Sequence, residues 1–325
     1  MALPRTLLIS SVVIFGLIGA VALIKKKSAS HAAIEQIVQE VSLDNRSNDT
    51  ASQAVSGPVR SQPDSASEFS DVDRIGQLFA LDSSKLPIVE TISYTSRVPW
   101  LKDRPAWIAD YASHYATSRH FIARSLNRKP DYFSQKASPG DRFNVFKRDL
   151  NLTFHLLIDL SKCRMKFYYY DADSNERVLL KTYRVGVGRV DPKRSSGYLT
   201  PTGKFLLGNK IAVYRPGTMG FFQDRKVEMI RVFGTRWIPF EKEVEGCSES
   251  AKGFGIHGAP WIEDAAGQLV EDRNKVGHYE SDGCIRLLSE DIEEIFSIIV
   301  TKPTTIELVK DFHDAKLPGV EKDSP

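Results

Sequence analysis

The chain has 325 residues, which is enough for about two domains. Hydrophobic residues make up 42% of it and charged residues 26%, which are ordinary values for a globular protein with a packed core. The net charge of +3 is too small to indicate a nucleic-acid-binding protein, and the sequence holds no P-loop or GxGxxG motif.

The first predicted element is residues 7–24, LLISSVVIFGLIGAVALI, which contain no charged side chain. As a helix rising ~1.5 Å per residue they would span about 27 Å, close to the hydrocarbon core of a bilayer. A cleaved signal peptide is the alternative, but three lysines (residues 25–27) come directly after the run instead of a small-residue cleavage site. We therefore expect a retained membrane anchor at residues 1–27. The three lysines by themselves favour a cytoplasmic location for the rest of the chain, but long domains cross largely regardless of such charges.

Residues 28–68 are rich in Ser, Ala, Gln and Asp and contain almost no aromatic side chains. A segment of this composition cannot bury enough apolar surface to fold alone. We expect a flexible linker here.

Residues 69–148 are expected to form a small α+β module. Apolar side chains at 107–115 and again at 121–126 have helical spacing, and Thr117-Ser118 is a candidate N-cap for the second helix. Pro139-Gly140-Asp141 predicts a turn, and the next residues alternate as a strand does. The segments WIADYASHYATSRHFIARSLN and PGDRFNVF resemble a divergent LysM module, a small glycan-binding unit with two strands flanking two helices. An unrelated helical packing domain is the alternative.

Residues 149–311 are dominated by short strand-like runs, including LTFHLLIDL and CRMKFYYYD. Many short strands at regular spacing predict a β-sandwich or a barrel-like sheet. A final helix is expected from Ser289, because SEDIEEIF starts with a capping residue, places acids in its first turn and has apolar residues at helical spacing. Residues 312–325 are left as a C-terminal tail.

The three cysteines are an odd number, so at least one thiol is free unless the protein pairs with another chain. A disulfide between Cys163 and Cys247 is one arrangement open to the other two outside the cytoplasm. Cys284 lies in HYESDGCIRL, directly after a glycine that permits a tight turn.

A cysteine nucleophile reacts as the thiolate and needs a depressed pKa, a nearby base and backbone N–H groups for the oxyanion. His257, in GFGIHGAPW, lies at the end of a strand-like run 27 residues before Cys284, which is a sensible position for that base. A structural zinc site would need four ligands, and Cys284 has no CxxC partner. A buried, inert cysteine is the other alternative.

Five segments of the second half of the chain occur in a fixed order: LIDLSKCRMKFYYYD, TYRVGVG, LTPTGKF, GFGIHG and SDGCIRLLSEDIEEIF. In this order they resemble the L,D-transpeptidase catalytic domain, also called the YkuD domain, over about residues 150–311. The resemblance implies a mainly β catalytic domain of the YkuD β-sandwich type that uses neither a metal nor another cofactor.

The resemblance also implies a role for each matching residue. Cys284 is the nucleophile and His257 its general base. Gly258 comes directly after the base, where the family uses a backbone carbonyl to orient the imidazole. Gly283 and Cys284 supply oxyanion-stabilising N–H groups, and Arg286 ties the active-site loop or contacts the substrate.

Asp282 is a departure from the family, which usually has His at this position (SHGC in place of SDGC). Because the base maps to His257, we expect the change to be tolerated, and we place Ser281 and Asp282 among the oxyanion- or substrate-binding candidates. A carboxylate within ~4–6 Å would disfavour the thiolate unless Arg286 neutralises it. The other interpretation is a turn residue that bonds its own backbone.

His278, six residues before Cys284, is the rival base. We favour His257, because a strand end fixes a side chain better than a loop does.

The activity implied by the resemblance is attack on the bond between the third residue, a diamino acid, and the fourth, D-alanine, of a peptidoglycan stem peptide. An amine of a second stem peptide then makes a 3–3 cross-link; water would make the enzyme an L,D-carboxypeptidase, and attachment or removal of a wall-linked lipoprotein uses the same chemistry. A degenerate, wall-binding tether is the hypothesis from a different class. We expect inhibition by carbapenems, anchoring in the bacterial inner membrane by a single span, and a catalytic domain in the periplasm.

Overall fold

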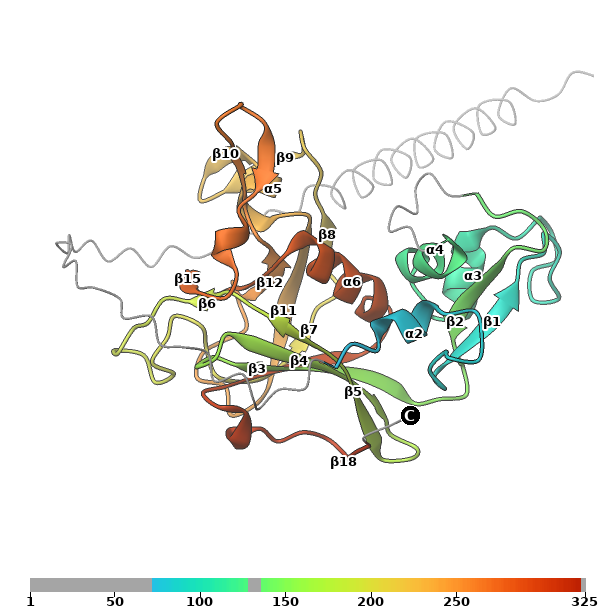
Figure 1. Ribbon diagram of the computed structural model, residues 1–325, viewed down its shortest axis with the longest axis horizontal. Coiled ribbons are helices and arrows are strands. Elements are labelled where there is room, and N and C mark those ends of the chain that lie inside the picture. The colour runs from blue at the N-terminus through green and yellow to red at the C-terminus, as the bar shows by residue number, and fades with distance from the viewer. Residues whose placement is uncertain (1–71, 128–135, 323–325) are drawn as a thin grey trace, which may run out of the picture. The chain divides into compact units, whose positions relative to one another are not determined.

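The computed structural model describes residues 72–127 and 136–322 (Figure 1). The expected anchor at residues 1–27 and linker at 28–68 lie outside the described residues. Within the described ranges the chain divides into two units. Met219–Val227 is the smaller and contains strand β9 (Met219–Phe222) and all but the last residue of β10 (Arg225–Glu228). All other described residues belong to the larger unit.

The lengths of the described helices contradict the expected membrane localisation. The longest of the described part, α6, has 11 residues, whereas a membrane span needs about 20. No helix in residues 72–127 or 136–322 is long and apolar enough to cross a membrane. This finding contradicts the single-pass inner-membrane placement with a periplasmic catalytic domain; the apolar run at 7–24, on which that expectation was based, lies outside the described residues.

A ten-stranded mixed sheet dominates the larger unit, as far as the chain is described. Its order is β16-β12-β11-β7-β17-β3-β4-β5-β18, and β8 pairs with β11 beside this path. The bounds are β3 (Leu152–Asp159), β4 (Arg164–Asp171), β5 (Glu176–Arg184), β7 (Gly203–Leu207), β8 (Ala212–Val213), β11 (Arg236–Glu245), β12 (Gly255–Gly258), β16 (Ile285–Leu287), β17 (Thr304–Val309) and β18 (Val320–Glu321). The expected mainly β catalytic region is confirmed.

Three two-stranded pairs complete the strands of the larger unit that are described: β1 (Val89–Ser93) with β2 (Arg142–Phe146), β6 (Val187–Gly188) with β15 (Tyr279–Ser281), and β13 (Trp261–Glu263) with β14 (Leu269–Glu271). The helices are α2 (Ile75–Phe79), α3 (Ile108–His114), α4 (Arg119–Asn127), α5 (Ile230–Phe233) and α6 (Ser289–Ile299), with 3₁₀ turns η1 (Arg273–Lys275) and η2 (Phe312–Asp314).

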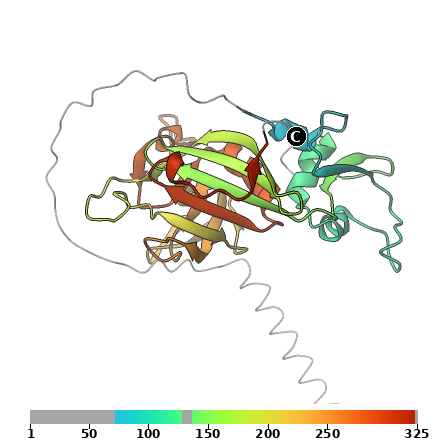
Figure 2. The same cartoon turned by 90° about the horizontal axis from the view of Figure 1, so that it is seen from below.

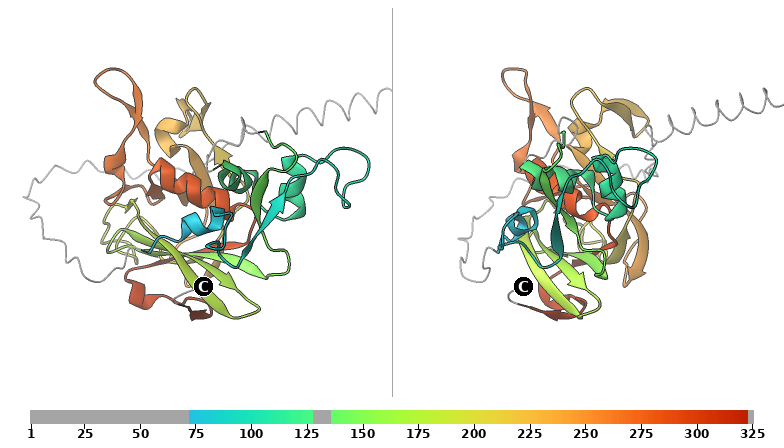
Figure 3. Two further views of the ribbon diagram at one scale, coloured as in Figure 1. Left: turned by 45° about the vertical axis from the view of Figure 1, so that its right-hand side comes forward. Right: turned by 90° about the vertical axis from the view of Figure 1, so that its right-hand side faces the viewer.

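Helix α6 begins at Ser289, as predicted, and lies beside the sheet (Figure 3). It buries an apolar stripe. Ile292, Ile295 and Phe296 are at most 1% exposed and belong to the main core. The Ser289 hydroxyl donates to Glu271 Oε1 at 2.7 Å and the N-cap position falls on Leu288, so the expected cap does not form. Burial of the stripe rather than the cap therefore stabilises this helix.

The expected small module has the chain order β1–α3–α4–β2, with β1 and β2 antiparallel. Ser118 caps α4, because its Oγ accepts a hydrogen bond from the Phe121 N–H at 3.0 Å. Strand β2 is buried on both faces from Phe143 to Phe146, where alternation was expected. The helix pair and the strand after it are confirmed, while the LysM relationship stays a prediction.

One hydrophobic core joins this module to the large sheet. Phe121 of α4 and Phe146 of β2 belong to the same buried cluster as Phe154 of β3 and Phe296 of α6. The Ser118 hydroxyl also donates to the Ser297 carbonyl of α6, and the His120 ring meets the Phe296 ring edge-on at 5.1 Å. The two parts therefore share one buried cluster.

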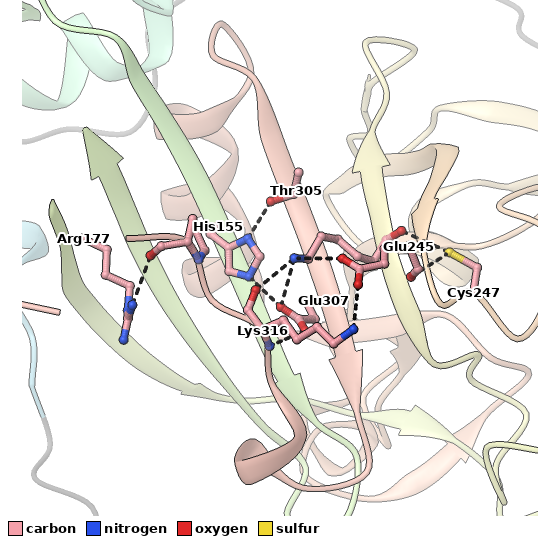
Figure 4. A network of polar contacts seen from close by, with 9 residues as sticks. His155, Arg177, Glu245, Cys247, Thr305, Glu307 and Lys316 are labelled. Atoms are coloured by element: carbon pink, nitrogen blue, oxygen red, sulfur yellow. Dashed lines mark hydrogen bonds and ion pairs between the residues drawn. The ribbon is translucent and has the colours of Figure 1, made fainter. Parts of the chain in front are cut away.

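The C-terminal residues lie on the face of the sheet that is opposite to α6, and there η2 contacts β3 (Figure 2). Figure 4 shows the polar network that holds them. The buried Glu307 carboxylate accepts hydrogen bonds from His155 Nε2 at 3.2 Å and from the Lys316 N–H at 2.7 Å, and Lys204 Nζ lies 3.7 Å from it. Lys316 Nζ in turn pairs with Glu245 at 2.6 Å. This network fixes the tail to β3, β7, β11 and β17.

Candidate active site

Strands β12 and β16 bring the two motifs of the second half together. They pair in parallel with Ile256 opposite Ile285 and His257 opposite Arg286. Cys284 immediately precedes β16, so the same register places it at the end of the strand pair next to Gly255. All four residues of β12 are buried, which makes this part of the site rigid.

His257 is 3% exposed, and its tautomer is fixed by one contact. Its Nδ1 lies 2.7 Å from the Gly258 carbonyl oxygen, which can only accept, so Nδ1 carries the proton and Nε2 has a free lone pair. The Phe233 ring meets the imidazole edge-on at 5.3 Å. Burial, reinforced by the positive charge of Arg286, lowers the pKa of His257 to about 3. The imidazole is therefore neutral at physiological pH.

The Cys284 thiol is half-buried and donates to the Gly253 carbonyl at 3.7 Å. No hydrogen bond joins its Sγ to His257 in the described chain. Burial raises the pKa of Cys284 to about 11; the Gly255 amide and Arg286 act in the opposite direction, and Asp282 adds to the rise. The depressed pKa expected for this thiol is thus not found, because desolvation outweighs the nearby positive groups.

The turn before Cys284 is held by two hydroxyl groups. Ser281 Oγ donates to the Cys284 carbonyl at 2.7 Å and accepts from the Gly283 N–H at 3.1 Å. Thr200 Oγ1 donates to the Gly283 carbonyl at 2.9 Å and accepts from the Gly188 N–H at 2.7 Å. Gly283 has φ +125°, and a Cβ there would lie 2.5 Å from the Phe254 ring, so only glycine fits. As an oxyanion donor, the Gly283 N–H would have to leave Ser281.

Asp282 lies on the surface, with its side chain 75% exposed, and pairs with Arg189 at 2.6 Å. The sequence had suggested Arg286 as the cation that neutralises this carboxylate. The structure places Arg189 there instead. The turn bonds expected of Asp282 are made by Ser281.

His278, the rival base, is exposed, and its carbonyl accepts from the Val187 N–H at 3.0 Å. The structure therefore places His257, and not His278, in the buried strand that pairs with the Cys284 segment. All three cysteines are free thiols, so Cys163 and Cys247 form no disulfide here.

Sequence reasoning missed Thr200 and Arg189. Thr200 lies 83 residues from the carbonyl it holds, and Arg189 lies 93 residues from its partner. The only signal for Thr200 was its place in the LTPTGKF segment, and for Arg189 there was none.

Residues 153–308 match the family model of the YkuD L,D-transpeptidase catalytic domain. This region of the chain is a YkuD domain. The match starts in β3 and ends in β17, so the YkuD domain includes the central strands of the sheet and both strands of the site. A search of curated proteins gave no significant match.

Solved structures similar to the chain include the helical cell shape determining protein Pgp2 from Campylobacter jejuni, at 16% identity and a TM-score of 0.32, covering 52% of this chain and 50% of that one. A mutant of the same protein gives a TM-score of 0.33 at 16% identity, with the same shares covered. Bd1075 from Bdellovibrio bacteriovorus gives 0.31 at 12% identity, covering 49% of this chain and 48% of that one. The chain thus spans about half the length of these proteins.

Proposed function

We propose that the protein is a peptidoglycan L,D-transpeptidase with Cys284 as its nucleophile. The observation that carries the proposal is the pairing of β12 with β16, which brings a neutral imidazole of fixed tautomer to the segment that starts with Cys284. A lone pair on Nε2 is what a general base needs to accept the thiol proton. The YkuD match supports the reaction class.

In the first step the Cys284 sulfur forms a bond to the carbonyl carbon between the third and fourth residues of a stem tetrapeptide. His257 accepts the thiol proton and passes it to the leaving nitrogen as the C–N bond breaks, so D-alanine leaves and a thioester remains. The amine of a second stem peptide then attacks this carbon; a C–N bond forms, the C–S bond breaks, and the thiol regains a proton. The product is a 3–3 cross-link.

Because the thiol and the imidazole are both neutral at rest, proton transfer accompanies attack and does not precede it. The oxyanion of the tetrahedral intermediate would be held by the N–H groups of Cys284 and Gly283, with Ser281 releasing the latter. Gly258 supports the base through its carbonyl, and Asp282 stays outside the chemistry, paired with Arg189.

The nucleophile is tested by intact mass spectrometry after incubation with a carbapenem, whose strained ring acylates such a thiol. We expect one covalent adduct on the wild type and none on Cys284→Ala. Cys247→Ala is the matched control, because Cys247 is also a free, partly buried thiol, and it should keep the adduct. An adduct on Cys284→Ala equal to that of the wild type would contradict the assignment.

The acyl acceptor decides between the related activities. With purified stem tetrapeptide, a transpeptidase gives a 3–3 linked dimer, an L,D-carboxypeptidase gives tripeptide and D-alanine only, and a lipoprotein-attaching enzyme needs an added protein amine. We propose the first, and a digest that contained tripeptide without dimer would favour the second.

A wall-binding role is the second candidate, and a surface feature of the β1–α3–α4–β2 module supports it. A cavity of about 490 Å³ is lined there by Tyr94, Trp107, Ile122 and Leu126, and the Trp107 side chain is 68% exposed. An exposed aromatic beside an apolar hollow suits the flat face of a sugar ring. We propose that residues 69–148 are a LysM-like glycan-binding module preceding a catalytic domain at 149–311 and a tail at 312–325.

Co-sedimentation with purified peptidoglycan separates the two roles. Full-length protein should pellet with the polymer, and Trp107→Ala should reduce the bound fraction while leaving the carbapenem adduct intact. Binding that persists in a wild type unable to change the muropeptide profile would favour the tether over the enzyme.

A further inference from the structure

The guanidinium of Arg286 has no partner within the described part of the chain. The backbone of Arg286 is firmly held, because its N–H donates to the Gly186 carbonyl at 2.9 Å and its carbonyl accepts from the Gly186 N–H at 2.8 Å. Its side chain makes no hydrogen bond or ion pair with any described residue, and its Nε is buried without a partner. The loop-tying role that the sequence allowed is thus performed by the backbone alone.

The carboxylates that act on Arg286 are already paired with other cations. Glu280 accepts from Lys275 Nζ at 2.6 Å, and Asp282 accepts from Arg189 Nη2 at 2.6 Å. Both raise the pKa of Arg286 through their charge, but burial is the largest effect and lowers it. An arginine keeps its charge under such conditions, so a partly desolvated positive charge faces the site without a counter-ion.

An unpaired charge that is partly buried is costly, and proteins tend to keep one where a ligand completes the pair. The planar guanidinium fits a carboxylate with two parallel hydrogen bonds. Arg286 lies opposite His257 in the β12–β16 register and two positions after Cys284, so its ligand lies beside the reacting bond. In the proposed reaction, the leaving residue carries its own carboxylate one carbon from the nitrogen that leaves.

We propose that Arg286 binds the free C-terminal carboxylate of the stem peptide and thereby restricts cleavage to the bond one residue from a free end. This inference rests on the proposed function. It makes Arg286 the residue that distinguishes a tetrapeptide from a longer or amidated stem.

The first test needs no substrate, so it stands even if the proposed reaction is wrong. Iodoacetate and iodoacetamide alkylate a thiol in the same way, but only iodoacetate carries a carboxylate. Peptide mass mapping measures the rate at which each reagent alkylates Cys284. We expect the ratio of the iodoacetate rate to the iodoacetamide rate to fall about 10- to 100-fold in Arg286→Gln, because a hydrogen bond between charged groups is worth that much. Arg286→Lys should retain part of the ratio.

Arg273→Gln is the matched control, because Arg273 is exposed and already paired with Glu290 at 2.6 Å. It should leave the ratio within about twofold, as expected for a screened surface charge. Any change in the pKa of the thiol alters both rates alike and cancels in the ratio. An unchanged ratio in Arg286→Gln would overturn the proposal.

The second test compares stem tetrapeptides that end in a carboxylate or in an amide. The wild type should prefer the acid about 10- to 100-fold in kcat/KM, and Arg286→Gln should lose this preference, so that its acid-to-amide ratio falls to near one. A diamino acid at the third position of the stem can carry a side-chain carboxylate that also lies near the bond. Repeating the comparison with stem peptides that have lysine as third residue removes this side-chain carboxylate. If Arg286→Gln loses kcat/KM only with substrates that have this side-chain carboxylate, whatever their C-terminal group, the assignment of Arg286 to the C-terminal carboxylate is wrong.

Discussion

His257 and Cys284, whose segments the β12–β16 pairing brings together, are both neutral at rest. The imidazole is neutral because burial lowers its pKa to about 3, and the thiol is protonated because burial raises its pKa to about 11. Desolvation therefore dominates both groups. In the proposed reaction charge develops only when substrate arrives, and Arg286 is the unpaired cation of the described residues next to these two side chains.

Replacing the two histidines separately tests which one is the base. His257→Gln should lower kcat by about 10²- to 10⁴-fold, because the Nε2 lone pair is lost, whereas His278→Gln should stay within about twofold. The measurement is release of D-alanine from a stem tetrapeptide, with carbapenem acylation as an independent check. Loss of activity in His278→Gln alone would reverse the assignment.

The sequence predicted that the two motifs belong to one site, and the structure brings them together in the β12–β16 pair. His257 lies in β12, and Gly283 and Cys284 directly precede β16. Each of these motifs is one short, continuous stretch of sequence. The consequence of SDGC could not be predicted, since it depends on Arg189, a residue far away in the chain. Asp282 is exposed and paired, so its effect on Cys284 is screened by solvent.

At the scale of elements, local patterns predicted α3, α4 and α6 but not the short helices α2 and α5. Ser118 caps α4 as expected, and α6 starts at Ser289 although Ser289 does not cap it. The parallel pairs β12–β16 and β3–β17 were not predictable, because their partners are brought together only by the tertiary fold. The β12–β16 pair nevertheless decides where His257 meets the Cys284 segment.

Asn144 of β2 connects three elements of the module and should be sensitive to replacement. It is fully buried; its Nδ2 donates to the carbonyls of Leu78 and Ala80 at 2.9 and 2.7 Å, and its Oδ1 accepts from Thr91 Oγ1 at 2.8 Å. Asn144→Ala should reduce the free energy of unfolding by about 2–4 kcal/mol, because several buried groups lose their partners.

Urea denaturation monitored by tryptophan fluorescence measures this effect. Asn274→Ala is the control, since Asn274 is exposed, and it should change the free energy of unfolding by no more than about 0.5 kcal/mol. A loss of similar size in both variants would mean that the Asn144 contacts contribute nothing specific.

For the whole molecule, two buried histidines and one partly buried histidine make the fold sensitive to acid. Burial is the largest effect at His120, His155 and His257, and lowers the pKa of each below its ordinary 6.5. The unfolded chain therefore takes up protons below about pH 6.5 that the folded chain refuses. Stability is complete above that pH and falls as the pH drops toward the folded pKa values.

Between pH 6.5 and the folded pKa values, each histidine lowers the free energy of unfolding by up to about 1.4 kcal/mol for each unit by which the pH falls. We expect the urea midpoint to be constant between pH 7 and 8 and to fall steadily from pH 6.5 to 5. His155→Gln should reduce the slope, while His278→Gln, at an exposed position, should leave it unchanged. A midpoint that rises on acidification would contradict the sign.

The core that α4 and β2 share with α6 and β3 has an evolutionary consequence. Domains joined only by a linker can be lost or exchanged by recombination without disturbing their neighbours. Here such an exchange would expose Phe154 and Phe296 to water, so we expect the two parts to be inherited together. We expect substitutions at Ser118 or His120 on one side to require matching changes around Ser297 on the other.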